Sequence, residues 1–131
     1  MRNLKMKNLV IPSTKKTPEI IFKANGELMV TGSSLPANVT EFYQPIFVWL
    51  EELKKCPPLK ISISFDLEHI NTTSTRMILQ ILKLLSTMAK AKNSLQVIWK
   101  YESEDNDMLE QGEALQQILK RPFEFIEINK D

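Results

Sequence analysis

One change of periodicity in the middle of the chain constrains the fold more than any other feature. From Leu59 to Leu67 apolar and polar residues alternate, which predicts a β-strand with one buried face. From about Thr73 to Lys90 apolar residues recur every three or four positions, which predicts a helix with a wide buried stripe. A half-buried strand followed at once by a well-buried helix is typical of layered α/β domains.

The rest of the chain continues this succession of strands and helices. Asn25-Gly26 lies between two apolar runs and predicts a hairpin with a type I′ turn, in which both central residues have positive φ. Asn38 is a candidate N-cap for a helix over about Val39–Lys55, in which Pro45 predicts a kink or a later start. The remaining predicted elements are a strand at Ser94–Tyr101, a helix at Asp105–Lys120 and a strand at Phe123–Ile128. The order β-β-α-β-α-β-α-β predicts one α/β domain, with an N-terminal hairpin in front of a mixed sheet and helices packed on it.

The length of 131 residues fits a single domain. We expect residues 19–131 to form it, preceded by a basic arm at residues 1–18 that holds a short edge strand at Leu9–Ile11. The chain shows neither the apolar segment of a secretory signal nor the roughly 18 apolar residues of a membrane span. Its net charge of +1 offers no general attraction for nucleic acids or membranes, so neither is an expected partner. The expected location is the cytoplasm.

Sequence motifs of the common catalytic sites are absent. The chain has no glycine-rich phosphate loop and no GxSxG elbow. One histidine, His69, and one cysteine, Cys56, are too few for a zinc site. The acidic residues between Glu102 and Glu113 are interpreted as a solvated first helical turn, with a partner-facing acidic patch as the alternative. We therefore expect a protein that is not an enzyme and that binds no metal or cofactor.

The segment Asp66–Arg76 carries the strongest functional signal. It joins the central strand to the most apolar helix through a run of small hydroxyl and amide residues. Such side chains cap a helix by accepting from its unpaired backbone N–H groups. Capping needs one residue, for which Thr73 and Ser74 are candidates, so the other hydroxyls of the run are left without a role.

An exposed hydroxyl at a helix N-terminus is also suited to phosphorylation. The phosphate would carry about −1.5 to −2 charges, accept hydrogen bonds from the helix end and pair with Arg76 one turn further on. It would face Glu68 and could face Asp66 as well. At about 7 Å and an effective dielectric constant of about 20, each pair of unit charges is worth roughly 2 kcal/mol. A partner that docks on the neutral surface would then lose affinity on the order of 100-fold.

Separated motifs over nearly the whole chain resemble one family. They are Ile11-Pro12 with Thr17-Pro18-Glu19-Ile20, Asn25-Gly26, Gly32-Ser33-Ser34 with Pro36 and Asn38, Glu41-Phe42-Tyr43 with Trp49-Leu50-Glu51, Asn71-Thr72 with Ser74, Trp99 with Tyr101, Gly112-Glu113, and Pro122-Phe123-Glu124-Phe125. In this order and spacing the sequence is similar to the SiaC-type regulatory phosphoproteins, which share a fold with STAS-domain anti-anti-sigma factors. The resemblance implies a STAS-like single domain. The sequence departs from the family pattern at Ala37, where the family has Glu, and at His69, where it has Tyr.

The resemblance also implies a function in a partner-switching pathway. The phosphorylated residue of the family corresponds to Thr72, with Thr73 and Ser74 as alternates. A histidine-kinase-like ATPase acts as the Ser/Thr kinase, and a PP2C-type phosphatase removes the phosphate. The unphosphorylated form binds and activates a diguanylate cyclase, which raises cyclic di-GMP and promotes biofilm formation or aggregation. The expected partner-binding residues are Glu68, His69, Asn71, Thr73, Ser74 and Arg76.

Two other classes of function remain open at this point. A small-molecule-binding α/β domain would contain a deep pocket with converging polar groups. A constitutive interaction scaffold would use the hydroxyl-rich segment as a helix cap and nothing more.

Overall fold

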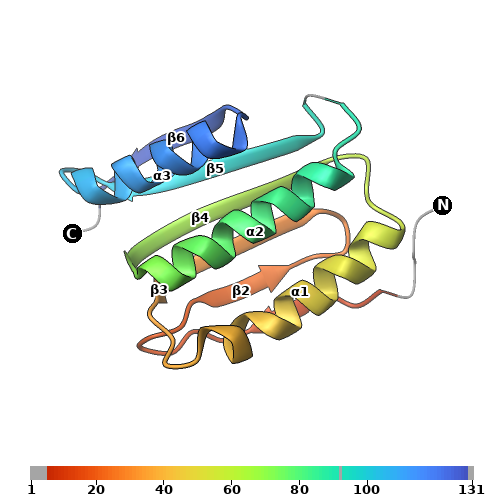
Figure 1. Cartoon of the computed structure of the whole chain (residues 1–131), viewed down its shortest axis with the longest axis horizontal. Coiled ribbons are helices and arrows are strands. Elements are labelled where there is room, and N and C mark those ends of the chain that lie inside the picture. Colours follow the sequence, from red (N-terminus) through yellow and green to blue (C-terminus); the bar gives the residue numbers. More distant parts are fainter. Residues whose placement is uncertain (1–5, 92, 130–131) are drawn as a thin grey trace.

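The computed structural model describes residues 6–91 and 93–129 as a six-stranded sheet with three helices on one face (Figure 1). The strands are β1 (Leu9–Ile11), β2 (Glu19–Phe22), β3 (Glu27–Ser34), β4 (Ile61–Ile70), β5 (Leu95–Glu102) and β6 (Phe123–Ile128). The helices are α1 (Val39–Lys55), α2 (Thr72–Met88) and α3 (Asn106–Leu119). The predicted mixed α/β sheet is confirmed, and so is the short edge strand predicted at Leu9–Ile11, which forms β1 of the same sheet.

The strands lie in the sheet in their order along the chain, β1-β2-β3-β4-β5-β6. β1, β2 and β3 pair antiparallel, whereas β3, β4, β5 and β6 pair parallel. Each helix therefore connects two neighbouring parallel strands, and every connection proceeds in the same direction across the sheet. Because such connections share one handedness, all three helices fall on the same face, as Figure 1 shows.

The hydrophobic core lies between the sheet and these helices. Its strand members are Ile20, Phe22, Leu28, Val30, Ile61, Ile63, Phe65, Leu67, Leu95, Val97, Trp99 and Phe123. Its helix members include Tyr43, Ile46, Leu50, Leu53, Ile78, Ile81, Leu82 and Leu85. The alternation predicted for the central strand is confirmed, because every second residue of β4 from Ile61 to Leu67 is buried.

β4 extends three residues beyond its predicted end, to Ile70. The end of β3 continues to pair with it, since Ser33 lies opposite His69 and Ser34 lies opposite Ile70. A register shift just before Ser33 leaves Glu68 outside the regular pairing. Glu68 and His69 therefore belong to a strand, where the sequence interpretation had placed a connection.

The hairpin turn after β2 differs from the predicted type I′ turn. Gly26 has a φ of +101°, but Asn25 does not have a positive φ. The N–H of Gly26 donates to the carbonyl of Lys23 over 3.0 Å, which makes Ala24 and Asn25 the central residues. The Asn25 side chain accepts the N–H of Glu27 at 3.0 Å. The turn is thus followed by a glycine bulge, as in hairpins with three-residue loops.

Helix α1 begins where the sequence predicted, at Val39. The side-chain oxygen of Asn38 accepts the N–H of Glu41 at 3.0 Å, so Asn38 is the N-cap. Pro45 lies inside the helix, and the alternative of a later start is wrong. A proline there removes the hydrogen bond to the carbonyl of Glu41, yet the remaining helix continues through it.

Helix α3 approaches the sheet closely over Trp99. The indole is fully buried, and its Nε1–H donates to the carbonyl of Met108 at 2.9 Å. A Cβ atom on Gly112 would lie 2.5 Å from Cδ1 of this indole. The absence of a side chain at Gly112 is therefore what allows α3 to pack on β5, although glycine costs about 1 kcal/mol in a helix interior.

The substitution Gly112→Ala tests this contact. It should lower the free energy of unfolding by about 1 to 3 kcal/mol, the usual range for an overpacked core, despite the better helix propensity of alanine. Chemical denaturation followed by circular dichroism measures the change. Gln117→Ala, at an exposed position of the same helix, should leave stability unchanged or slightly raised. A Gly112→Ala protein as stable as the wild type would contradict the packing argument.

Candidate functional site

The segment between β4 and α2 lies at the edge of the sheet where the parallel strands end and the helices begin (Figure 1). Asn71 is the single residue between Ile70, which ends β4, and Thr72, which begins α2. The N–H of Asn71 donates to the carbonyl of Ser34 at 3.3 Å and so ties this link to the end of β3. The start of α2 thus presents backbone N–H groups and the positive end of the helix dipole at a fixed place.

Asn71 is the N-cap of α2. Its Oδ1 accepts the N–H of Ser74 at 2.8 Å and the hydroxyl of Thr73 at 3.0 Å. Its carbonyl accepts the N–H of Thr75 at 3.0 Å, the first hydrogen bond of the helix. The expectation that Thr73 or Ser74 caps the helix is therefore wrong. The helix starts at Thr72, one residue earlier than predicted, because the cap comes from the residue before it.

Thr72 occupies the first position of α2 and is exposed. Within residues 6–91 and 93–129, nothing hydrogen-bonds to its hydroxyl, and the backbone N–H groups of Thr72 and Thr73 have no acceptor. The neighbouring hydroxyls are engaged: that of Thr73 donates to Asn71, and that of Thr75 donates to the Asn71 carbonyl at 3.1 Å and to Gln111 at 3.2 Å. Among the hydroxyls of this first turn, Thr72 is thus the one that is both exposed and unbonded.

Ser74 faces the interior of the protein. It is fully buried and accepts a hydrogen bond from Ser34 at 2.8 Å, while the hydroxyls of Ser34 and Tyr43 lie 2.6 Å apart. Burial raises the pKa of Tyr43, and the hydrogen bonds with Ser34 and Ser74 oppose this shift only in part. These three hydroxyls tie β3, α1 and the start of α2 together. The buried position of Ser74 argues against both roles that the sequence suggested for it, alternate phosphate acceptor and partner contact.

Charged side chains lie on both sides of the α2 N-terminus. Arg76 is exposed one turn after Thr72 and forms no ion pair with any residue that the structure describes. Glu68 and His69 are exposed at the end of β4 and border a hollow of about 330 Å³, to which Asp105 also contributes. The start of α2 therefore has an available cation on its helical side and a carboxylate on its strand side.

Asp66 does not belong to this site. It alternates with the buried residues Phe65 and Leu67, so its side chain lies on the face of the sheet opposite the helices. Its neighbours in the sheet are Thr31 and Lys100. The expectation that a phosphate near the start of α2 could face Asp66 is wrong, because the sheet lies between them.

A groove of about 460 Å³ between α2 and α3 opens beside Thr72. Its lining includes Thr72, Arg76 and Leu79 from α2 and Ala114, Leu115 and Ile118 from α3. The side chain of Ile118 is 56% exposed. Ile118 was assigned no role from the sequence, and so the groove was missed. The available signal was its position three residues after Leu115, at the margin of the apolar stripe of α3.

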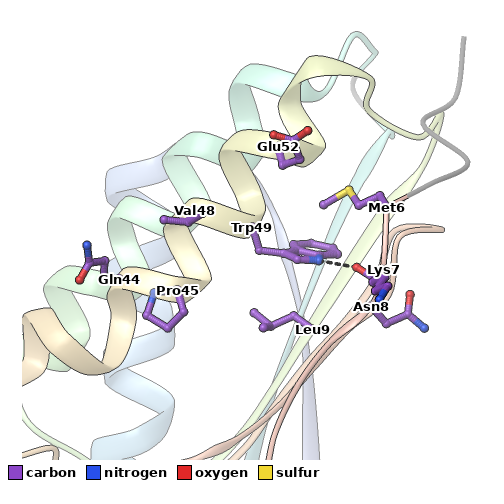
Figure 2. Close-up of a pocket in the computed structure, with 9 residues that line it drawn as sticks. All are labelled: Met6, Lys7, Asn8, Leu9, Gln44, Pro45, Val48, Trp49 and Glu52. Carbon is purple, nitrogen blue, oxygen red and sulfur yellow. Dashed lines mark hydrogen bonds between the residues drawn. The ribbon is translucent and has the colours of Figure 1, made fainter.

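A second hollow, of about 730 Å³, lies between α1 and residues 6–9, which precede and begin the edge strand β1 (Figure 2). Figure 2 shows the Trp49 indole projecting into it, with Nε1–H donating to the carbonyl of Lys7 at 2.8 Å. The carboxylate of Glu52, which also lines this hollow, forms an ion pair with Lys55 at 3.0 Å. A small-molecule site needs free polar groups that converge, and in this hollow the Trp49 indole N–H and the Glu52 carboxylate are already engaged within the protein.

The residues that the structure describes hold neither a metal-binding cluster nor a helix suited to crossing a membrane. No group of three or more His, Cys, Asp or Glu side chains there is arranged to hold a metal ion. None of the helices in that part of the chain has both the length and the apolar composition that crossing a bilayer requires.

The profile of the family described as SiaC family regulatory phosphoprotein matches residues 11–128. An uncharacterized protein of Pseudomonas aeruginosa (strain UCBPP-PA14) is 27% identical over 120 residues, which cover 90% of this chain and 94% of that protein.

Solved structures give the same result. The crystal structure of apo-SiaC from Pseudomonas aeruginosa matches with a TM-score of 0.81 at 25% identity, over 92% of this chain and 99% of that one. A chain of the crystal structure of the diguanylate cyclase SiaD in complex with its activator SiaC, from the same organism, matches with a TM-score of 0.83 at 25% identity and the same two coverages. Because the family profile spans nearly the whole sequence, this chain belongs to the SiaC family of regulatory phosphoproteins.

Proposed function

We propose that this protein is a non-catalytic regulator whose binding activity is switched by phosphorylation of Thr72. In the unphosphorylated form it binds and activates a diguanylate cyclase, and the phosphate blocks this interaction. Membership of a family of regulatory phosphoproteins supports the first part. The complex of the relative SiaC with the cyclase SiaD supports the choice of effector. Through cyclic di-GMP the protein would act on biofilm formation or aggregation.

The state of the Thr72 hydroxyl is the observation that carries this proposal. A kinase needs an acceptor hydroxyl that it can reach and that the fold does not use. Thr72 meets both conditions, whereas Thr73 donates to Asn71 and Ser74 is buried. Thr73 remains the alternate acceptor, because it is exposed and would have to give up a single hydrogen bond.

The surroundings of Thr72 suit a phosphate once it is attached. The free N–H groups of Thr72 and Thr73 and the positive end of the helix dipole favour a negative charge there. Arg76 can form a charge-assisted hydrogen bond with the phosphate one turn further on. The helix would therefore accept the modification without refolding.

A docked partner would experience the same phosphate as an added charge of about −1.5 to −2. Glu68 already places a carboxylate at the adjoining strand end, so the local surface would become strongly negative. At about 7 Å and an effective dielectric constant of about 20, each opposing pair of unit charges contributes roughly 2 kcal/mol. Repulsion of this size is enough to release a partner that binds the neutral surface.

The partner surface that we propose consists of exposed or half-buried residues around this point. They are Glu68, His69, Asn71, Thr73 and Arg76. Ser74 would contribute indirectly, because its contact with Ser34 holds the first turn of α2 in place. Two enzymes complete the proposal, a histidine-kinase-like ATPase that acts as the Ser/Thr kinase and a PP2C-type phosphatase, and both would act in the cytoplasm.

The main rival is a constitutive scaffold in which the hydroxyl-rich run is only a cap. The cap is supplied by Asn71 alone, which leaves the Thr72 hydroxyl without a structural role. This observation favours a switch over a scaffold.

Treatment with ATP and the host's histidine-kinase-like Ser/Thr kinase should add one phosphate, which tandem mass spectrometry will find on Thr72. Thr72→Val should abolish the modification. The matched control Thr73→Val has the same change one residue on and should still be phosphorylated. Phosphate outside residues 72–75, or none with a kinase that is active on another substrate, would overturn the proposed switch.

Binding to the effector gives an independent test. Each purified diguanylate cyclase of the host is titrated with the protein, and calorimetry and cyclic di-GMP synthesis report binding and activation. Phosphorylation should weaken the interaction at least tenfold and up to about 100-fold, because of the charge repulsion. Thr72→Val should bind like the unmodified protein and remain bound after kinase treatment. Equal binding by the modified and unmodified forms would favour the scaffold.

A further inference from the structure

The groove between α2 and α3 has walls that restrict what can fill it. Leu79, Leu115 and Ile118 give it an apolar lining, and Thr72 and Arg76 lie along its α2 wall. Ile118 is more than half exposed although it is a large aliphatic residue on an otherwise polar helix surface. An exposed aliphatic side chain beside an apolar groove indicates a surface that another apolar segment can cover.

The backbone of the groove walls indicates which kind of segment this is. Inside a helix the N–H and C=O groups are bonded to one another, so α2 and α3 offer none along their length. An extended peptide is held by pairing with a free strand edge, and the sheet edges are β1 and β6, not this groove. A helix satisfies its own backbone groups and contributes side chains alone, so it can cover the groove without burying unpaired peptide groups.

The two helices that form the groove also carry opposite charges, and among their charged residues Arg76 lines the groove itself. The charged residues of α2 are Arg76 and Lys83, both basic, whereas those of α3 are Asp107, Glu110 and Glu113, all acidic. A helix lying along the groove is complementary to both walls when its acidic residues flank α2 and its basic residues flank α3. This arrangement also fixes the direction in which its apolar face must point.

We propose that the α2–α3 groove docks an amphipathic helix of the effector, with an acidic flank against Arg76 and a basic flank against α3. The inference rests on the proposed function and adds to it the docking place and the chemistry of the partner segment. It also accounts for the action of the phosphate. A phosphate on Thr72 pairs with Arg76 in the same chain and repels the acidic flank. The docked helix therefore loses its ion pair with Arg76 and is also repelled by the phosphate.

Substitutions in the α2–α3 groove and in the hollow beside α1 test this inference. The probe is the full-length diguanylate cyclase that the unmodified protein activates. Ile118→Glu should weaken its binding at least tenfold, and Ala114→Gln, which extends a side chain over the groove, at least threefold. Val48→Glu is the matched control, since Val48 is an aliphatic residue of α1, 64% exposed, that borders the other hollow. It should change binding by less than twofold. Phosphorylation of Thr72 by the kinase should proceed in all three variants, which shows that the fold is intact.

A photo-crosslinking residue at position 118 identifies the shape of the docked segment. Crosslinks to the cyclase should fall at positions spaced three and four residues apart, as on one face of a helix, and crosslinks at alternate residues would indicate a strand and overturn the inference. Unchanged binding by Ile118→Glu, with release by phosphorylation preserved, would refute the groove and leave the switch standing. Loss of binding in Val48→Glu alone would move the docking site to α1. If no cyclase binds the unmodified protein, the proposed function fails first.

Discussion

The hydrogen bond from the N–H of Ser74 to the side chain of Asn71 determines what the rest of the site can do. It fixes the first turn of α2, in which successive residues are about 100° apart around the helix axis. Thr72 and Ser74 therefore point in nearly opposite directions. Because Ser74 is held inside by Ser34 and Tyr43, Thr72 must face outwards. The exposure of the Thr72 hydroxyl, the proposed phosphate acceptor, is thus a consequence of the cap and of the buried hydroxyls together.

The packing of all helices on one face of the sheet explains why Thr72 lies beside the groove between α2 and α3. With all helices on one face, their N-termini share the edge where the parallel strands end (Figure 1). The link from β4 to α2 is a single residue, so the start of α2 is held directly by the sheet. The groove between α2 and α3 begins at the same place. A phosphate on Thr72 would therefore alter the proposed docking surface, while the core and the opposite face of the sheet would stay as they are.

Patterns that depend on one element could be predicted from the sequence, and contacts between elements could not. The alternation around Phe65 and the cap at Asn38 were predicted because each depends on local geometry alone. The cap of α2 was assigned wrongly because Asn71, Thr73 and Ser74 are all chemically competent, and burial of Ser74 by α1 and β3 decides between them. The extension of β4 to Ile70 depends on pairing with β3, which a single strand pattern does not contain.

The groove was missed for a related reason. Helical spacing indicates which residues share a face but not how far the next helix stands away, so the exposure of Ile118 could not be predicted. The turn type predicted at Asn25-Gly26 was wrong for a third reason. The Asn-Gly pair is compatible with two hairpin geometries, and the hydrogen bond from Gly26 to Lys23 selects the longer loop.

A phosphate at the first position of a helix acts in opposite directions on the fold and on the complex. Within the chain it meets free N–H groups, the positive helix end and Arg76, interactions that stabilise the folded protein. Across an interface it meets a partner fitted to a neutral hydroxyl, where the same charge repels. At Ser74 the modification would first have to break the contact with Ser34 and bury a charge, which costs stability. With the exposed Thr72 hydroxyl outside the cap and the buried Ser74 hydroxyl inside it, one helix turn could serve both folding and the proposed regulation.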